Sequence, residues 1–471
     1  MISHLVILLT DALIFLLLLL SIVFGIYASR RAHLRRPWGL VVRSRVGVGS
    51  MVVLAFYLVV GLLDSIHFHP LSQPADGAAE QTRSTEVISL FDSMVSGLRT
   101  RQEKTYSAPL ATHLYAKESI ELADGSTIRD FPRLQHAGVH LPDPAQKTAD
   151  ILKLSAIGIL KGIAVSVVAV NTLIMLLAVK ARSNFGEQAR RVLLATGSEI
   201  PWRVVLVVLS SMLVLIFWSA ELAANYHLLG TDKVGEDVFY QALKSIRTGL
   251  VIGTLTTLVM LPAAVMLGIM AGYFRGWVDD LIQYIYTTLN SIPGVLLIAA
   301  AILMLQIYMS NHAEEFNSLV ERADLRLLFL CIILGVTSWT GLCRLLRGES
   351  MKLREVDYVQ AATAFGVSHL QIISRHILPN VLHIVLIAVV LDFSGLVLAE
   401  AVLSYVNIGV DPTMNSWGNM INSARLEMAR EPIVWWSLAA AMIFMFTLVL
   451  SANLFSDVVR DAFDPRLRSS R

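Results

Sequence analysis

Charged residues and cysteines are both scarce in this sequence of 471 residues. Only 16% of the residues are charged, 55% are hydrophobic, and the net charge of +2 gives no indication of a nucleic-acid partner. The two cysteines, Cys331 and Cys343, lie twelve residues apart in one apolar run. On a helix this separation is too long for a disulfide. We therefore expect both to be packing residues.

The sequence also lacks recognisable catalytic motifs. It contains no G-x-x-x-x-G-K-[ST] phosphate loop, no H-E-x-x-H zinc motif and no local nucleophile–base pair. Two histidine pairs, His67 with His69 and His136 with His140, have no cysteine or tight carboxylate cluster nearby to complete a tetrahedral metal site. We therefore expect no catalytic residue, no metal site and no cofactor in this chain. Any ATP hydrolysis would have to occur in another polypeptide.

Long apolar runs recur along most of the chain, and each is long enough to cross a bilayer as a helix of about 20 residues. They predict an all-α membrane protein with about nine transmembrane helices. The predicted spans are 5–27, 46–66, 154–179, 204–224, 246–272, 288–308, 326–346, 381–406 and 433–456. The first run has no basic segment before it and no small-residue cleavage site, so we expect it to be a retained span rather than a signal peptide.

Basic residues in the connecting loops predict the orientation. The loop between the first two spans contains six arginines and no acid, which places it in the cytoplasm and the N-terminus outside. Alternation then puts 180–203, 273–287, 347–380 and the C-terminus inside. Two loops not used for this assignment agree with it. The loop 180–203 is basic, whereas 309–325 holds four acids and one arginine.

The domain organisation follows from these spans. Residues 1–66 contain two spans and their basic loop, 67–153 form a polar outer segment, and 154–203 contain the third span and a cytoplasmic linker. The remaining residues, 204–471, hold six spans. In the outer segment we expect a short helix around 84–100, then irregular chain or a few strands.

The stretch from Arg347 to Leu382 is a polar island between two apolar runs. Within it, Tyr358, Ala361, Ala362 and Phe365 fall on one face of a helical wheel. Gly366 follows where a left-handed cap would end that helix. Further on come Leu378 and Pro379, and this proline can only open a helix or break one. A surface helix with a small-residue face, a glycine stop and a proline restart indicates a docking element. An ordinary amphipathic connector is the alternative.

Several motifs resemble one family in their order along the chain. The spacing Ala361-Ala362-x-x-x-Gly366 followed by Ile377-x-Pro379 resembles the loop by which ABC importer permeases hold their ATPase. The flanking matches are Gly230-Thr231-Asp232-x-x-Gly235-x-Asp237-Val238, Ala271-Gly272-Tyr273-Phe274-x-Gly276-Trp277-Val278-Asp279, Leu398-Ala399-Glu400-Ala401-x-Leu403-Ser404, Ser416-Trp417-Gly418-Asn419-Met420 and Asp461-Ala462-x-Asp464-Pro465-Arg466. Together they resemble the dipeptide/oligopeptide permeases of the "C" type, over a little more than half of the chain.

The resemblance implies a type I ABC importer permease core in 204–471, with its transmembrane domain at about 245–456 and its coupling loop at 347–380. It implies a bacterial inner-membrane location and an alternating-access mechanism for peptides or similar small solutes. The implied partners are a homologous permease, two ABC ATPase subunits that bind ATP and Mg²⁺, and a periplasmic substrate-binding protein. The implied ATPase-coupling residues are Tyr358, Gln360, Ala361, Ala362, Phe365, Gly366, Leu378 and Pro379.

Two features depart from the family pattern. The family's loop usually begins Glu-Ala-Ala, whereas this chain has Gln360 at the first position, with Glu355 and Asp357 nearby. Three extra spans and the outer segment also precede the usual six spans. They could dock a binding protein, contact the partner permease or act as a brace, and the sequence does not choose among these.

Ionisable residues inside spans are costly and usually face protein or water. Asp392 and Glu400 share the eighth span, eight residues and about 80° apart on a helix. The resemblance places this span beside the central cavity, so both are candidates for the translocation path. For Asp392 a helix–helix hydrogen bond is the favoured alternative. Asp11 and Glu221 lie toward outer span ends, where they could reach lipid headgroups.

Two other functions fit a multi-span protein. A secondary transporter driven by an ion gradient would favour broken helices and several charges near mid-membrane, and few are central here. A non-transporting scaffold or sensor would use the outer segment as a receptor, but it would leave the 347–380 motif without a purpose.

Overall fold

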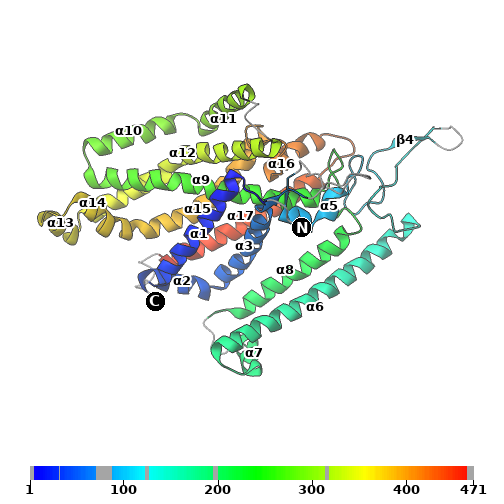
Figure 1. Cartoon of the computed structure of the whole chain (residues 1–471), viewed down its shortest axis with the longest axis horizontal. Coiled ribbons are helices and arrows are strands. Elements are labelled where there is room, and N and C mark those ends of the chain that lie inside the picture. Colours follow the sequence, from blue (N-terminus) through cyan, green and yellow to red (C-terminus); the bar gives the residue numbers. More distant parts are fainter. Residues whose placement is uncertain are drawn as a thin grey trace, which may run out of the picture. The chain divides into compact units, whose positions relative to one another are not determined.

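The structure is a computed structural model that describes residues 5–30, 32–70, 87–121, 127–194, 200–312 and 318–463. It is almost entirely helical (Figure 1). The helices are α1 (Leu9–Ser29), α2 (Ala32–Arg43), α3 (Arg45–Asp64), α4 (Leu90–Met94), α5 (Ser96–Thr100), α6 (Lys147–Ala181), α7 (Phe185–Leu194), α8 (Trp202–Ala223), α9 (Val238–Phe274), α10 (Trp277–Ser291), α11 (Gly294–Asn311), α12 (Leu319–Arg354), α13 (Asp357–Ala364), α14 (His369–Ile372), α15 (Leu378–Tyr405), α16 (Trp417–Glu427) and α17 (Trp436–Phe463). A 3₁₀ turn, Pro144–Gln146, precedes α6, and a π-helical turn, Ile373–Ile377, precedes α15.

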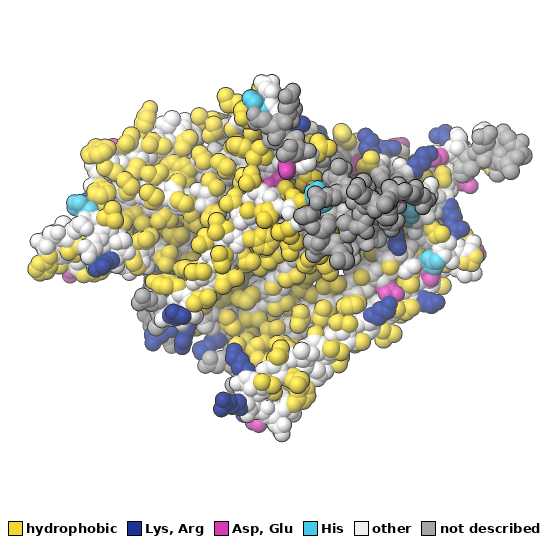
Figure 2. All heavy atoms as spheres, viewed as in Figure 1, with side chains coloured by type: hydrophobic (Ala, Val, Ile, Leu, Met, Phe, Trp, Pro, Cys, Tyr) yellow, Lys and Arg dark blue, Asp and Glu magenta, His cyan; other side chains and the backbone are white. Residues whose placement is uncertain are grey.

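Nine helices within the described residues are long and apolar enough to cross a membrane, and they confirm the nine predicted spans. They are α1, α3, α6 with its preceding turn, α8, α9, α11, α12, α15 with the α14 segment, and α17. Hydrophobic side chains cover much of the face drawn in Figure 2, as a lipid-facing surface requires. The sixth span begins at Gly294 rather than 288, because α10 ends at Ser291 and Pro293 precedes α11.

The chain groups into two compact units, which are described separately. The first comprises Met1–Val6, Trp38–Arg247 and Asn415–Leu454. Its longest helix pair is α6 with α8, which lie side by side with α7 at one end (Figure 1). Gly158 and Gly162 form a G-x-x-x-G pattern on α6. A Cβ at Gly162 would lie 2.7 Å from the Cα of Val214 on α8. The two backbones therefore approach closely, as in other small-residue interfaces of membrane helices.

The outer segment also belongs to the first unit and contains short strands. The strands β1 (Leu5–Val6), β2 (His67–Phe68) and β3 (Ile88–Ser89) form an antiparallel sheet in the order β1-β2-β3. The strands β4 (Glu118–Glu121) and β5 (Thr127–Asp130) pair as a hairpin. The helix expected around 84–100 is two short helices, α4 and α5, that meet at Val95, and residues 84–86 lie outside the described part of the chain.

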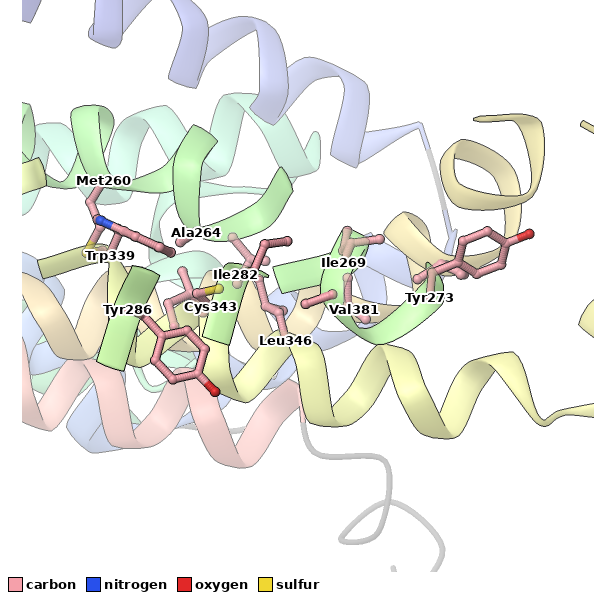
Figure 3. Close-up of a cluster of buried hydrophobic side chains, with 14 of the residues drawn as sticks. Met260, Ala264, Ile269, Tyr273, Ile282, Tyr286, Trp339, Cys343, Leu346 and Val381 are labelled. Atoms are coloured by element: carbon pink, nitrogen blue, oxygen red, sulfur yellow. The ribbon is translucent and has the colours of Figure 1, made fainter. Parts of the chain in front are cut away.

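The second unit comprises Ile7–Pro37, Thr248–Met414 and Phe455–Arg471. Its buried side chains form two clusters. One gathers around Leu255, Leu327 and Cys331, and partly buried residues of α1 pack against it. The other contains side chains from α9, α10, α12 and α15, which converge in Figure 3. Both cysteines are fully buried, as packing residues would be.

Two charged residues expected to reach headgroups have other surroundings. Asp11 is buried at the start of α1, where the preceding Thr10 donates its backbone N–H to Asp324 of α12. Glu221 accepts a 2.7 Å contact from Lys161 of α6, so it is neutralised by an ion pair between two spans. An ion pair lowers the cost of a charge in a membrane.

Candidate functional site

The segment between α12 and α15 folds as a compact tip at one end of these two helices (Figure 1). Helix α13 starts after Val356, whose backbone is extended, and its first residue is Asp357. A carboxylate in the first turn interacts favourably with the positive end of the helix dipole. The predicted short helix is therefore present, and it is only eight residues long.

Gly366 ends α13 in the predicted left-handed conformation, with φ of +73°. Its N–H donates to the carbonyl of Thr363 at 3.0 Å, and the N–H of Val367 donates to the carbonyl of Ala362 at 3.1 Å. These two bonds define a Schellman motif. Val367 and Ala362 also pack against the same buried cluster, which supplies the hydrophobic contact that accompanies such a cap.

Helix α13 is attached to the second unit through its inward side. Val359 is 1% exposed and belongs to the buried cluster of Figure 3, against which Ala362 also packs. Ala362 is thus half-buried, whereas Ala361 and Gln360 are exposed. Of the four residues expected on one face, Tyr358, Ala361 and Phe365 are therefore exposed and Ala362 is half-buried.

The tip exposes large apolar side chains. Phe365 is 87% exposed, Leu370 of α14 is 81% exposed and Tyr358 is 44% exposed. The sequence prediction included Phe365 and Tyr358 but missed Leu370. The available signal was an apolar residue in a polar stretch, four positions after the helix-ending glycine. Exposed large apolar side chains gathered at such a tip indicate a surface that contacts another protein or the membrane.

The end of α9 supports the tip from the side. The hydroxyl of Tyr273 lies 2.8 Å from Nδ1 of His369. The backbone carbonyl of Tyr273 accepts a 2.9 Å hydrogen bond from Arg354. Arg275 forms a 2.7 Å ion pair with Glu355. The Ala271–Asp279 motif therefore contacts the 347–380 loop both before and after α13. Nothing in the sequence marked the Tyr273–His369 contact, because its residues are 96 positions apart.

Arg347 and Asp279 join α12 to α10 by a two-pronged ion pair. Nε and Nη2 of Arg347 donate to the two carboxylate oxygens of Asp279 at 2.6 and 2.8 Å. The hydrogen bonds from Arg347 hold the pKa of Asp279 below its ordinary value, although burial opposes them. Bidentate pairs fix geometry as well as charge. The pair therefore sets the direction in which α12 enters the 347–380 loop.

Close backbone packing joins α9 to α12 next to this ion pair. Gly268 and Gly272 form a second G-x-x-x-G pattern. A Cβ at Gly272 would lie 2.4 Å from the carbonyl oxygen of Arg347, and one at Gly268 would lie 2.8 Å from that of Cys343. Neither position can accept a side chain without a backbone shift. The two helix backbones are therefore in direct contact where they approach the tip.

Leu378 and Pro379 are the first residues of α15. The sequence predicts that this proline either opens a helix or breaks one, and it opens one. Pro379 has no N–H to offer the preceding turn, and that turn is π-helical. The side chain of Asn380 donates to the hydroxyl of Tyr358 at 3.0 Å and thereby links α15 directly to α13. Leu378 packs against the buried cluster.

Gln360 has a local role on the exposed surface. Its amide nitrogen donates to the carbonyl of Glu355 at 3.2 Å and approaches the carboxylate of the same residue at 3.4 Å. Glu355, which also pairs with Arg275, is therefore the carboxylate closest to the position where the family pattern has glutamate. Asp357 is exposed nearby.

The two carboxyl groups of α15 differ in their surroundings. Glu400 is buried and accepts a 2.7 Å hydrogen bond from Ser404, one turn further along the same helix. Asp392 is half-buried and has no hydrogen bond or ion pair with any described residue. The helix–helix hydrogen bond favoured for Asp392 is therefore not present among the described residues.

In the first unit, the remaining motifs build loops that the sequence predicts to lie outside, called the outer loops below. Gly235 has a positive φ, and a Cβ there would overlap the backbone of Glu103. The indole N–H of Trp436 donates to the carbonyl of Thr231 at 2.9 Å. Ser416 caps α16 by accepting the N–H of Asn419 at 3.0 Å. These residues shape structure rather than a reactive centre. The terminal match extends into 464–466, which lie outside the described residues.

A buried charge cluster in these outer loops was not predicted. Nδ1 of His227 lies 2.7 Å from Oδ2 of Asp237, and Nε2 lies 3.5 Å from Oε1 of Glu103. Burial opposes protonation of His227, but the two carboxylates outweigh it and raise its pKa to about 9. Burial also opposes ionisation of Glu103 and by itself raises the pKa of that carboxyl group. Hydrogen bonds from His227 and from the backbone N–H groups of Gln135 and His136 outweigh burial and lower this pKa to about 2.

Within the described residues, no group of three or more histidine, cysteine or acidic side chains could hold a metal ion. Of the histidines considered in the sequence, His140 contacts Asp150 at 2.7 Å and His67 is buried in β2. The 347–380 loop is therefore the candidate functional site, and the described residues offer no candidate metal centre as an alternative.

Comparison with known proteins identifies relatives of the second half of the chain. A family profile described as "binding-protein-dependent transport system inner membrane component" matches residues 264–469, a range that contains the whole 347–380 loop. A glutathione transport system permease protein from Pectobacterium atrosepticum is 31% identical over 248 residues, which cover 52% of this chain and 75% of that protein. An oligopeptide transport system permease protein from Mycobacterium bovis is 32% identical over 245 residues, covering 52% and 78%. A dipeptide transport system permease protein from Lactococcus lactis is 30% identical over 240 residues, covering 51% and 64%.

Proposed function

Because this chain belongs to the binding-protein-dependent transport system inner membrane components, we propose that its 347–380 loop docks an ATP-hydrolysing subunit and transmits that subunit's motion to α12 and α15. The chain is a multi-pass permease subunit of an ABC importer. Its sequence contains no phosphate-binding loop of the G-x-x-x-x-G-K-[ST] type. We therefore assign the binding of ATP and Mg²⁺ to separate ATPase subunits.

The observation that carries this proposal is the apolar tip. Phe365 and Leu370 are the most exposed apolar side chains of the loop. Phe365 follows α13, which is anchored by the buried Val359, and Leu370 lies on α14, which is anchored by the buried Ile372. Burying a large apolar side chain contributes about 1.5–3 kcal/mol. Two such side chains on a supported tip are suited to fill a groove in a partner. The partner's displacement then reaches α12 through the short connection at Glu355 and Val356, and α15 through Asn380.

The substrate and the other partners follow from the relatives. Permeases of similar sequence are named for glutathione, oligopeptides and dipeptides, so we assign this chain to a system for peptides or similar small solutes. A second, homologous permease and an external substrate-binding protein would complete the system. Asp392, half-buried and without a partner in the described chain, is the better candidate for the translocation path, while Glu400 holds its own helix turn. We also propose the domain boundaries that the sequence predicts, which are 1–66, 67–153, 154–203 and 204–471. In the proposed orientation, residues 347–380 lie in the cytoplasm.

The test is co-purification of the permease with its ATPase. Gly366→Trp places a large side chain where a Cβ meets nothing within 4 Å, so it obstructs the docking surface, and it also strains the cap because φ is +73°. Phe365→Ser removes the exposed ring. We expect each variant to weaken ATPase association by at least about tenfold, in line with the loss of one large buried side chain. Ala362→Arg would also weaken it, but this residue packs on the core and the effect would be mixed.

Matched controls separate docking from folding. Gly366→Asn keeps a residue that tolerates positive φ and should preserve association. Leu426→Ser removes an apolar side chain that is 70% exposed on α16 and should also preserve it. Membrane insertion should be unchanged in all variants. Full ATPase association and transport in both Gly366→Trp and Phe365→Ser would refute the docking assignment.

A further inference from the structure

A groove in the first unit lies outside the region matched by the family. It is bounded by α6, α7 and α8 and has a volume of about 550 Å³. Its lining is mostly apolar and includes Ile163, Val167, Val170, Ile174, Leu193 and Val214. This volume falls within the range of about 300–1,000 Å³ that is typical of small-molecule sites.

The polar side chains in the groove are largely occupied by helix carbonyls. The hydroxyl of Ser166 donates to the carbonyl of Ser210 at 3.4 Å, and the amide of Asn171 donates to the carbonyl of Val167 at 2.8 Å. The groove therefore offers little to a polar ligand. It runs along two membrane-spanning helices, so hydrocarbon chains are the apolar molecules that surround it.

The α7 end of the groove is basic. The stretch 180–194 contains Lys180, Arg182, Arg190 and Arg191 against one acid, Glu187, which already pairs with Arg191 at 2.5 Å. The other three basic side chains are exposed. Lys180 and Arg182 follow the last groove residue of α6, Ile174, by six and eight residues, or about 9–12 Å along a helix. In Figure 2, Lys and Arg side chains are visible near the tip formed by α7.

We propose that this groove binds one acyl chain of an anionic phospholipid, with the lipid phosphate held by Lys180, Arg182 and Arg190. The apolar lining matches the chain, and the basic end matches the phosphate. Basic pockets between membrane helices recognise anionic headgroups in this way. Helix α7 is amphipathic: Val192 is buried, whereas Arg190 is exposed. Such a helix lies along the bilayer interface, where headgroups are found.

The inference assigns a role to the extra spans that is independent of ATPase docking. A bound lipid would fill the space between α6 and α8 beyond their close contact at Gly158 and Gly162. It would thereby stabilise a helix pair whose outer faces are exposed to the bilayer.

The experiment measures lipid binding to the purified full-length chain. The delipidated protein is titrated with phosphatidylglycerol and, separately, with phosphatidylcholine of the same acyl chains, and bound lipid is counted by native mass spectrometry. We expect phosphatidylglycerol to bind at least about tenfold more tightly. The double variant Lys180→Gln/Arg190→Gln should remove most of this preference, since each basic residue contributes about fivefold to tenfold.

Matched variants test the groove itself. Val167→Trp fills it and should abolish binding of both lipids, whereas Val168→Trp, at the neighbouring exposed position that does not line the groove, should leave binding intact. Lys153→Gln, toward the other end of α6, should keep the preference for phosphatidylglycerol. Equal binding of the two lipids by the unmodified chain would overturn the proposal. Unchanged lipid binding in Val167→Trp would also overturn it. If that variant kept its lipid binding but lost a partner subunit, the groove would hold a protein helix instead of a lipid.

Discussion

His227 lies between two carboxylates, Asp237 and Glu103, in the outer loops of the first unit. The three groups join parts of the chain that are more than 120 residues apart in sequence. A buried ion cluster of this kind is strongly coupled to pH, because removing one charge leaves the others unpaired. The cluster therefore makes the stability of the outer loops depend on protonation.

The pH dependence has a definite sign. The pKa of His227 is raised from 6.5 to about 9, so its stabilising contribution is complete below pH 6.5 and is lost as the pH rises through 9. Glu103 acts in the opposite direction. Its pKa is lowered from 4.5 to about 2, so its contribution is present above pH 4.5 and is lost as the pH falls through 2. Both contributions are present between pH 4.5 and 6.5.

We predict that the melting temperature of the purified chain falls between pH 6.5 and 9.5, and that this fall is reduced in His227→Gln. The shift in the pKa of His227 corresponds to at most about 3 kcal/mol. Thermal unfolding followed by tryptophan fluorescence at several pH values would measure it. His136→Gln, at an exposed histidine of the same segment, is the control and should retain the full pH dependence. An identical pH profile for His227→Gln and the unmodified chain would contradict the assignment.

Single residues of the 347–380 loop were predictable where one position imposes a backbone requirement. Gly366 is such a position, and its left-handed cap is confirmed. Pro379 is another, and it opens α15. The burial of Val359 and the exposure of Leu370 could not be predicted in this way. Both depend on which neighbouring helix covers α13 and α14, and a local pattern contains no information on that.

At the level of elements, α9 and α12 pack closely in the second unit. The G-x-x-x-G pattern of Gly268 and Gly272 was present in the sequence, but which helix it faced was not. Its partner is α12 at Cys343 and Arg347. In lipid, where apolar burial does not drive helix association, such close contact supplies van der Waals attraction.

We predict that Gly272→Ala destabilises the permease by about 1–3 kcal/mol, because its Cβ would overlap the carbonyl oxygen of Arg347 at 2.4 Å. Gly348→Ala is the matched control. Gly348 lies on α12, and a Cβ there meets nothing within 4 Å. This control should be neutral or stabilising by up to about 1 kcal/mol, since alanine favours helix. Melting temperatures in detergent would compare the two variants. If Gly272→Ala were as stable as Gly348→Ala, the α9–α12 contact would be wrong.

At the scale of the whole molecule, hydropathy predicted the nine spans because each is an uninterrupted apolar run. The ends of the helices were less predictable. Helices α9 and α12 extend well beyond the predicted spans, because polar residues such as Arg354 continue the helix outside the apolar run. The amphipathic helices α2, α7, α10 and α16 are too short or too polar to be detected by a search for spans.

The orientation of the chain is open to a direct test with introduced cysteines. Both natural cysteines are fully buried, so they should contribute little background. We predict that a membrane-impermeant maleimide labels Lys117→Cys in right-side-out vesicles, and that it labels Gln371→Cys only after the membrane is permeabilised. The unmodified chain serves as the control. Labelling of Gln371→Cys from outside would place the 347–380 loop on the wrong side for an ATPase.

Helix α13 is held to the rest of the second unit by one fully buried side chain, Val359. Ala362 packs beside it on the same cluster, and Asn380 of α15 donates a hydrogen bond to Tyr358 on the exposed side. If an ATPase docks on this loop, as we propose, a push on Phe365 or Leu370 would rotate α13 about its buried side. The hydrogen bond to Asn380 would then pass that rotation to the first turn of α15, so that a sideways displacement becomes a twist of a membrane helix.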